Sequence, residues 1–424
     1  MNAASSSGAT APSARSPVEP PAARPAASAS APSAQALAWV QRLVRIDTRS
    51  ERTNLALIET IADHLRTLAV PLRLTYDETR KKANLFATLG AGKPAGVVLS
   101  GHTDTVPWDG QQWTLEPLAA EVRRAPEPRL YGRGSADMKG FIGCVVAQTE
   151  RLLAADLPFA VHYAFSYDEE VGGFGARGLI ADLRDAGLAP RICLVGEPTG
   201  MIPALGHKGV YRWRCHVRGH AAHSSRTPFA VNAVENAARV IARIADLADE
   251  LRERERRREG YDVPYTTAAV CRVEGGVADN IVPEACRLHY EFRNLPGTDA
   301  DALQQRVRDY AATLEPAMKA VDASSGIRFE QTAVMPEFEA KPDEPAVRLA
   351  EHLAAASKTT LVAFGTEAGL FQRAGISTVV CGPGSIAQAH QADEFVALEQ
   401  LGRCEGFVRG LLTPEAAALA LAAR

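Results

Sequence analysis

The pattern of apolar residues changes twice along this 424-residue chain, and this change constrains the fold more than any other feature. Runs such as Gly96–Ser100 and Arg191–Val195 are short and mostly apolar, and they alternate with segments of helical periodicity, which is typical of an α/β sheet. Between residues 208 and 337 the strands instead alternate apolar and polar residues. We therefore expect an α/β domain, residues 35–207 and 338–424, with a smaller α+β domain inserted in it.

Apolar periodicity predicts the individual elements. In the first domain we expect strands at 96–100, 159–166, 191–195 and 378–381, and helices at 54–68, 142–153 and 176–186. In the insert we expect strands at 210–217, 284–292 and 327–334 and one long helix at 231–259. The order strand, helix, strands, helix, strand predicts a small α+β sandwich of the ferredoxin-like kind.

Composition excludes several classes of protein. The formal net charge is -3 and the isoelectric point about 6.4, so the chain has no general basic field to gather nucleic acid or an anionic membrane surface. No apolar stretch reaches the length of a membrane span, and no secretory leader is visible. The 7 cysteines are scattered and form no CxxC pair, which predicts free thiols and a cytoplasmic location.

The first segment, from Met1 to about Ser33, consists almost entirely of Ala, Ser, Pro and Gly. Such a mixture buries too little apolar surface to offset the entropy of ordering, so we expect residues 1–34 to be a disordered tail. A transit peptide is the weaker alternative, because the density of proline opposes an amphipathic helix.

Asp, Glu and His side chains stand at the ends of predicted strands or in the following loops. Alone, each could be a helix cap or a solvated loop residue. Together they favour a carboxylate-rich binuclear site for Zn²⁺ or Co²⁺, in which a water would become a nucleophile near neutral pH. The five places are His102-Thr103-Asp104, Asp137, Asp168-Glu169-Glu170, Glu197 and His390.

Spacing predicts different roles within two of these groups. Residues two apart on an extended chain face the same way, so Asp104 can accept the free ring N–H of His102 and orient it. Adjacent side chains diverge, so in Asp168-Glu169-Glu170 one glutamate can bind metal while its neighbour serves as general base.

Six motifs in order carry a resemblance to a known family. They are GHTDTVPWDGQQW, RLYGRGSADMKG, SYDEEVGG, LVGEPTG, GHKGVYR and CGPGSIAQAHQADEFV. This chain resembles, over about residues 35–410, the acetylornithine deacetylase branch of the superfamily that contains aminoacylases, succinyl-diaminopimelate desuccinylase and glutamate-releasing carboxypeptidases. The resemblance implies a zinc-peptidase-like catalytic domain and an inserted lid and dimerisation domain.

The resemblance also implies a role for each matching residue. His102, Asp137 and Glu197 would hold one metal ion, and Asp137, Glu170 and His390 the other, with Asp137 bridging. Glu169 would be the general base, and the bond Asp137–Met138 would be cis.

In the insert, His223 resembles the histidine that stabilises the oxyanion in a neighbouring subunit's site. Without the surrounding match, it would be a solvated loop histidine. Asn280 and Arg293 resemble the residues that bind the substrate α-carboxylate, which suits an Arg fork. Glu367, in FGTEAGLF, is either a partner for a cationic ornithine side chain or a carboxylate at a helix N-terminus.

Three other interpretations have weaker support. Residues 173–178 spell GxGxxG, but they follow three carboxylates that would repel a pyrophosphate, so we interpret the glycines as a tight turn. Residues 252–259 mix charge signs, which is typical of a solvated helix face. Ser385 lacks the strand context of a serine nucleophile.

The sequence therefore predicts a homodimeric, two-metal amidohydrolase. Its expected reaction converts Nα-acetyl-L-ornithine to acetate and L-ornithine in arginine biosynthesis. The alternative is a relative that acts on N-succinyl-diaminopimelate, another N-acyl amino acid or a dipeptide. An inert scaffold on the same fold would lack a metal ligand or the base, yet every such position is occupied.

Overall fold

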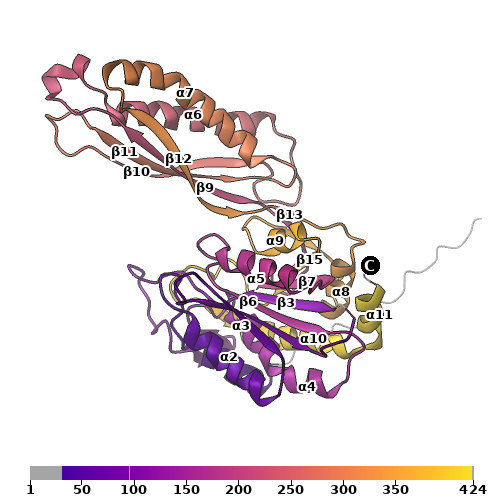
Figure 1. Cartoon of the computed structure of the whole chain (residues 1–424). Coiled ribbons are helices and arrows are strands. Elements are labelled where there is room, and N and C mark those ends of the chain that lie inside the picture. Colours follow the sequence, from indigo (N-terminus) through magenta and orange to yellow (C-terminus); the bar gives the residue numbers. More distant parts are fainter. Residues whose placement is uncertain (1–30, 95, 423–424) are drawn as a thin grey trace, which may run out of the picture.

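The computed structural model describes residues 31–94 and 96–422, which form two units with separate hydrophobic cores (Figure 1). The larger unit contains a nine-stranded sheet, and the smaller unit a four-stranded sheet. Most of the tail predicted to be disordered, residues 1–30, lies outside the described residues.

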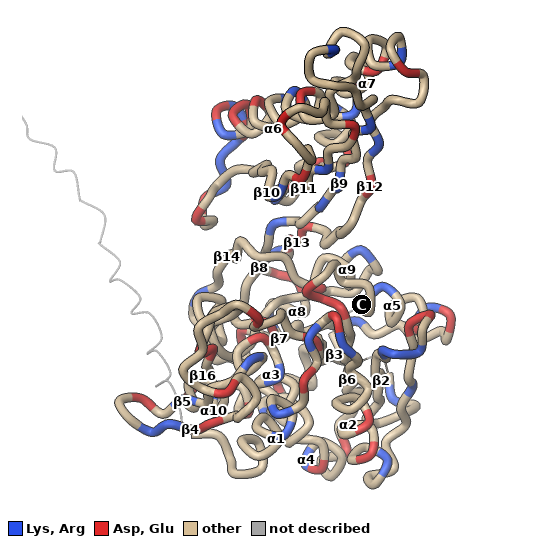
Figure 2. The backbone as a smooth tube through the Cα atoms, turned by 90° about the vertical axis from the view of Figure 1, so that its left-hand side faces the viewer, with Lys and Arg blue, Asp and Glu red and all other residues tan. Residues whose placement is uncertain are grey.

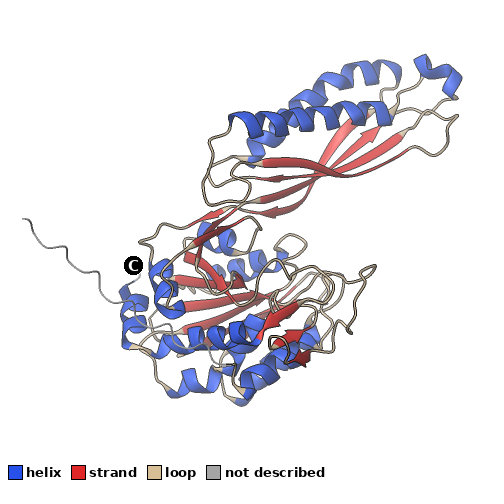
Figure 3. Ribbon diagram, turned by 180° about the vertical axis from the view of Figure 1, so that it is seen from behind, coloured by secondary structure: helices blue, strands red, loops and turns tan. Residues whose placement is uncertain are grey.

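The centre of the large sheet is parallel, because β3 pairs in parallel with β6 and β7, and β15 with β7. Helices cover both of its faces (Figure 3), which explains why its central strands are buried throughout. The expected α/β class with a mostly parallel central sheet is confirmed. The strand order is β1 (Leu72–Tyr76), β2 (Ala83–Leu89), β6 (Val161–Ser166), β3 (Val97–His102), β7 (Ile192–Pro198), β15 (Ser377–Gly382), β8 (Ala204–His207) and β13 (Phe338–Glu339), with β14 (Thr360–Val362) beside β8.

Nine α-helices of the described chain belong to the larger unit. The predicted helix at 142–153 is two helices, which are separated at Gln148. The side-chain amide of Gln148 donates a hydrogen bond to the Glu405 carboxylate. The larger unit also contains a small three-stranded sheet, which consists of β4 (Glu121–Arg123), β5 (Arg129–Tyr131) and β16 (Phe395–Ala397). The helices are α1 (Ala34–Val44), α2 (Leu55–Thr67), α3 (Lys139–Ala147), α4 (Thr149–Ala154), α5 (Phe174–Asp185), α8 (Pro345–Ala354), α9 (Ala368–Arg373), α10 (Leu398–Arg409) and α11 (Pro414–Ala422).

The smaller unit has the ferredoxin-like order βαββαβ, with its strands arranged β10-β11-β9-β12. Two helices pack on one face of the antiparallel sheet (Figure 3), and the other face is partly exposed. The elements are β9 (Val210–Arg218), α6 (Ala233–Arg254), β10 (Thr267–Gly275), β11 (Ala285–Arg293), α7 (Ala300–Val321) and β12 (Gly326–Met335).

Helix α6 ends five residues earlier than predicted. Glu255 turns to an extended backbone, and its carboxylate accepts hydrogen bonds from the side chains of Thr266 and Thr298. The mixed-charge stretch at 252–259 therefore continues into a loop.

The GxGxxG tract is a tight turn that leads into α5. Gly173 has φ of 69°, and a Cβ on Gly175 would lie 2.2 Å from the carbonyl oxygen of Tyr167. Both glycines are needed for backbone shape and close packing.

All seven cysteines are free, and six of them are buried. Within the described part of the chain, no helix is both long and apolar enough to span a lipid bilayer.

Candidate metal centre

Adjacent parallel strands bring the chemistry-bearing residues together. His102 is the last residue of β3, Glu197 lies near the end of neighbouring β7, and Glu169 and Glu170 follow β6 on the other side of β3. The carboxyl ends of parallel strands meet at one edge of a sheet, where α/β proteins form their sites. Figure 2 shows acidic segments on the side of the larger unit that faces the smaller unit.

Asp137 lies between two histidines. Its Oδ1 is 2.8 Å from Nε2 of His102, and its Oδ2 is 3.2 Å from Nε2 of His390. Glu197 Oε1 lies 3.6 Å from the same His102 nitrogen, and Glu170 lies 3.1 Å from Nε2 of His390. The side chains therefore form two groups that share the carboxylate of Asp137.

Glu169 lies on the His102 side of this arrangement. Ligand atoms of His102, Glu169 and Glu197 all lie within 4.8 Å of one another, and so do those of His102, Asp137 and Glu170. Glu169 is thus close enough to bind metal itself or to act on a water beside one.

The electrostatics of the cluster favour added positive charge. Burial and the Glu197 carboxylate raise the pKa of Glu169 well above its usual value, and burial and Asp137 do the same for Glu197. Burial lowers the pKa of His390, but Asp137 and Glu170 raise it to about 11. Several buried carboxylates beside two imidazoles, with no thiolate among them, are a donor set that fits two divalent cations.

Asp104 is buried behind His102 and holds the loop that follows β6. Nδ1 of His102 lies 3.0 Å from the carbonyl oxygen of Asp104 and 3.5 Å from its carboxylate, so the carbonyl is the nearer acceptor. The carboxylate accepts hydrogen bonds from the backbone N–H groups of Glu169 and Glu170 and from the hydroxyl of Ser50. Asp104 thus orients both the imidazole and the two glutamates.

Glu394 is an organising residue that sequence reasoning missed. Its buried carboxylate accepts hydrogen bonds from the backbone N–H groups of Gly134, Ala136 and Asp137 and from the guanidinium of Arg133. These contacts fix the segment before α3, in which the Asp137–Met138 peptide bond is cis as expected. The only sequence signal was the place of Glu394, four residues after His390.

The structure does not bring the candidate residues of the smaller unit to this cluster. Arg293 is the last residue of β11, near the junction of the smaller unit with the larger one, and it pairs with Glu291. His223 and Asn280 lie at the opposite end of the same sheet, linked by the hydrogen bond from Ser224 N–H to the Asn280 carbonyl. One strand length, about 27 Å for nine residues, separates the two ends. Arg293 and Asn280 of one chain therefore cannot bind the same carboxylate.

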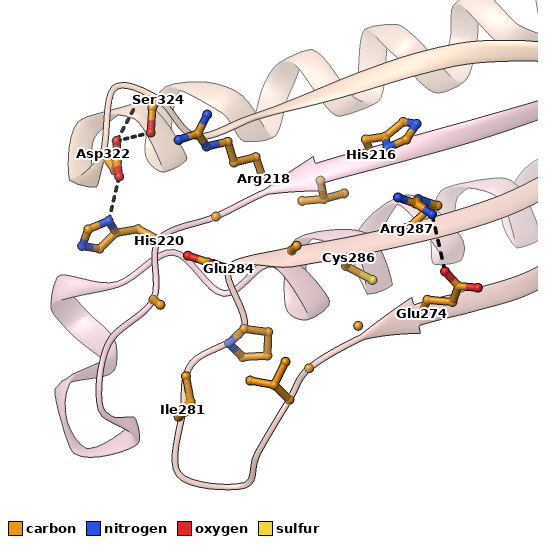
Figure 4. Close-up of a pocket in the computed structure, with 18 residues that line it drawn as sticks. His216, Arg218, His220, Glu274, Ile281, Glu284, Cys286, Arg287, Asp322 and Ser324 are labelled. Carbon is orange, nitrogen blue, oxygen red and sulfur yellow. Dashed lines mark hydrogen bonds and ion pairs between the residues drawn. The ribbon is translucent and has the colours of Figure 1, made fainter.

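The far end of the smaller unit, which we call the tip, is hollowed on its open side (Figure 4). The cavity is about 930 Å³ and lies among the ends of β9, β10 and β11. His220 contacts Asp322 at the left of this view, and Ile281 lies near the lower edge. Exposed apolar side chains surround the tip, with Val277 85 % exposed and Phe229 65 % exposed.

Glu367 is the residue just before α9 and is fully buried. Its two carboxylate oxygens accept hydrogen bonds from Ser166 and Ser100, and burial raises its pKa to about 7. In this conformation the side chain has no open surface toward a substrate, so its predicted contact with an ornithine side chain stays a prediction.

Asp, Glu and His side chains gathered around a shared, buried carboxylate at the edge of an α/β sheet fit the class of metal-dependent hydrolases. The chain belongs to peptidase family M20/M25/M40, whose model matches residues 98–413. It is a metal-dependent amidohydrolase.

Individual relatives agree with this assignment. The chain is 35% identical over 354 residues to an acetylornithine deacetylase from Proteus mirabilis, covering 82% of this chain and 87% of that protein. The fold is similar to that of an M20 family metallo-carboxypeptidase from Sulfolobus solfataricus, with TM-score 0.71, 16% identity and coverage of 89% and 98% of the two chains. It is also similar to a dinuclear metal binding M20 peptidase from Bacillus subtilis, with TM-score 0.59, 15% identity and coverage of 89% and 96%.

Proposed function

We propose that this protein hydrolyses the amide bond of Nα-acetyl-L-ornithine, giving acetate and L-ornithine. The observation that carries the proposal is the match at 35% identity to an acetylornithine deacetylase, in a chain that retains every candidate ligand and the candidate base. The reaction would be a cytoplasmic step of arginine biosynthesis.

Two divalent ions, Zn²⁺ or Co²⁺, would be held by the two groups that share Asp137. His102 and Glu197 would complete one site, and Glu170 and His390 the other. Both Nε2 atoms face Asp137, while Nδ1 of His102 is engaged by the Asp104 carbonyl, which leaves Nε2 as the ligand atom. When bound, such ions polarise an amide carbonyl and lower the pKa of water.

Glu169 would be the general base. Its backbone is fixed by Asp104, and its carboxylate lies beside His102 and Glu197, in reach of a water at the metal centre. It would take a proton from the attacking water and then deliver it to the departing amine.

The smaller unit would act as a lid and as the surface for a second copy of the chain. His223 and Asn280 lie at the tip. One strand length separates them from the junction with the larger unit, which carries the metal centre of their own chain. Exposed apolar residues surround them, as at a protein–protein contact. From this tip His223 would stabilise the oxyanion in the partner's site.

Arg293 would hold the substrate α-carboxylate. It lies where the smaller unit joins the larger one, and only Glu291 pairs with its guanidinium among the described residues. Its planar fork suits a carboxylate. Asn280 would contribute from the partner chain, because the two residues of one chain lie at opposite ends of the sheet.

Release of free amine by the Zn²⁺- or Co²⁺-loaded protein tests the proposal. Nα-acetyl-L-ornithine is compared with N-succinyl-diaminopimelate, acetyl-methionine and a dipeptide. We expect a preference for acetylornithine that a chelator abolishes. A preference for another substrate in the panel would keep the metal centre and overturn the substrate, and inactivity toward all four would contradict the proposal as a whole.

A further inference from the structure

His390, the candidate ligand on the more exposed side of the cluster, lies in a loop and not on a strand. Both His390 and Asp393 have left-handed backbones, with φ of 61° and 54°. Residues other than glycine adopt this conformation at a cost, so neighbouring contacts must hold it. The segment Gln111–Leu115 supplies those contacts, and we call it the bracket.

The bracket holds both left-handed residues. The side-chain amide of Gln111 donates a hydrogen bond of 2.8 Å to the carbonyl oxygen of His390. The carboxylate of Asp393 accepts hydrogen bonds from the backbone N–H groups of Thr114 and Leu115 and from the Thr114 hydroxyl. The loop that presents His390 is thus fastened on either side of Gln391 and Ala392.

The orientation of the Gln111 amide is itself fixed. Its oxygen accepts hydrogen bonds from Nη2 of Arg133 at 2.6 Å and from Nε1 of Trp113 at 3.0 Å. Arginine and tryptophan side chains can only donate, so the amide nitrogen is left to face His390. Arg133 is buried, lies over the Trp113 ring at 5.0 Å and binds Glu394.

These contacts join the two ligands of one metal site through protein atoms. Glu394 accepts the backbone N–H of Asp137, and Arg133 connects Glu394 to Gln111 and thereby to His390. The other group differs, because His102 and Glu197 lie on hydrogen-bonded strands of the central sheet. Its ligands are placed by the sheet and not by the bracket.

We propose that Gln111 is a positioning residue for the metal site formed by Asp137, Glu170 and His390, and that it acts on this site and not on the one containing His102 and Glu197. The inference rests on the proposed two-metal function. Outer contacts of this kind change metal affinity by about 10- to 100-fold.

Gln111→Glu tests the proposal with little change of shape. Glutamate keeps an acceptor for Arg133 and Trp113 but cannot donate to the His390 carbonyl. Stepwise binding of Zn²⁺ to the metal-free full-length protein is measured by competition with a chromophoric chelator. We expect one equivalent to bind with unchanged affinity and the second about 10- to 100-fold more weakly. The melting temperature of the metal-free protein should stay unchanged, because Gln111 is only half-buried.

Gln112→Glu is the matched control. Gln112 is exposed, and among the described residues its side chain makes no hydrogen bond, so the same change of charge one residue away should leave both affinities unaltered. Two equivalents of unchanged affinity in Gln111→Glu would overturn the inference, as would equal weakening in both variants. Failure of the unaltered protein to bind two equivalents would overturn the proposed function as well.

Discussion

The larger and smaller units differ in where their candidate functional residues lie. In the larger unit, residues far apart in sequence, from His102 to His390, converge on one buried carboxylate. In the smaller unit, Arg293 lies at the junction and His223 at the exposed tip, a strand length away. A parallel sheet makes a site within one chain because its strand ends meet. The long antiparallel sheet instead separates its ends, so under the proposed function the tip would serve a site in another molecule.

The largest effect is expected for Asp137→Ala, which removes the carboxylate shared by both groups. Metal affinity should fall by more than about 100-fold, since even outer contacts cost up to that amount, and turnover should vanish. Metal content by mass spectrometry and amine release measure the two effects. Retention of two tightly bound ions would show that Asp137 does not bridge.

Glu169→Gln should separate metal binding from chemistry. We expect kcat to fall about 10²- to 10⁴-fold, the usual contribution of a general base, while both ions stay bound. The control is Asp168→Asn, because Asp168 pairs with Lys82 and Asn tolerates its left-handed backbone. If Glu169→Gln turned over at the normal rate, another group would be the base.

Arg293→Lys tests the proposed substrate contact of the smaller unit, and its effect should be smaller than the effects of the two preceding variants. Lysine keeps the charge but loses the planar fork, so KM should rise about 10-fold, and at most about 100-fold, with kcat less affected. Arg243→Lys, on helix α6 where Arg243 pairs with Glu250, should leave KM unchanged. Equal effects in the two variants would mean that Arg293 does not contact substrate.

The sequence predicted the buried parallel strands and the alternating strands β9, β11 and β12 closely. A continuous apolar run marks a strand that is buried on both faces, and strict alternation marks a strand that is buried on one face. Strand β10 was missed because its residues are mostly exposed or half-exposed, and the edge strand β1 for a similar reason.

The candidate ligands were found from the sequence because metal chemistry restricts them to a few residue types. Gln111 and Glu394 were not found from the sequence, because they bind backbone atoms of residues that are distant in the chain. No local sequence pattern predicts such contacts. The separation of Asn280 from Arg293 also required the register of β11, since the resemblance assigns both to one carboxylate.

The central claim is that the chemistry of each site uses the larger unit of one chain and the tip of another. It is tested by combining two inactive variants, Glu169→Gln and His223→Ala, the second expected to lower kcat about 10²- to 10³-fold. In a mixed dimer, one site unites an intact larger unit with an intact His223. Co-expression in equal amounts should therefore restore about one quarter of normal turnover. Activity no greater than the mean of the two parent variants would contradict the account.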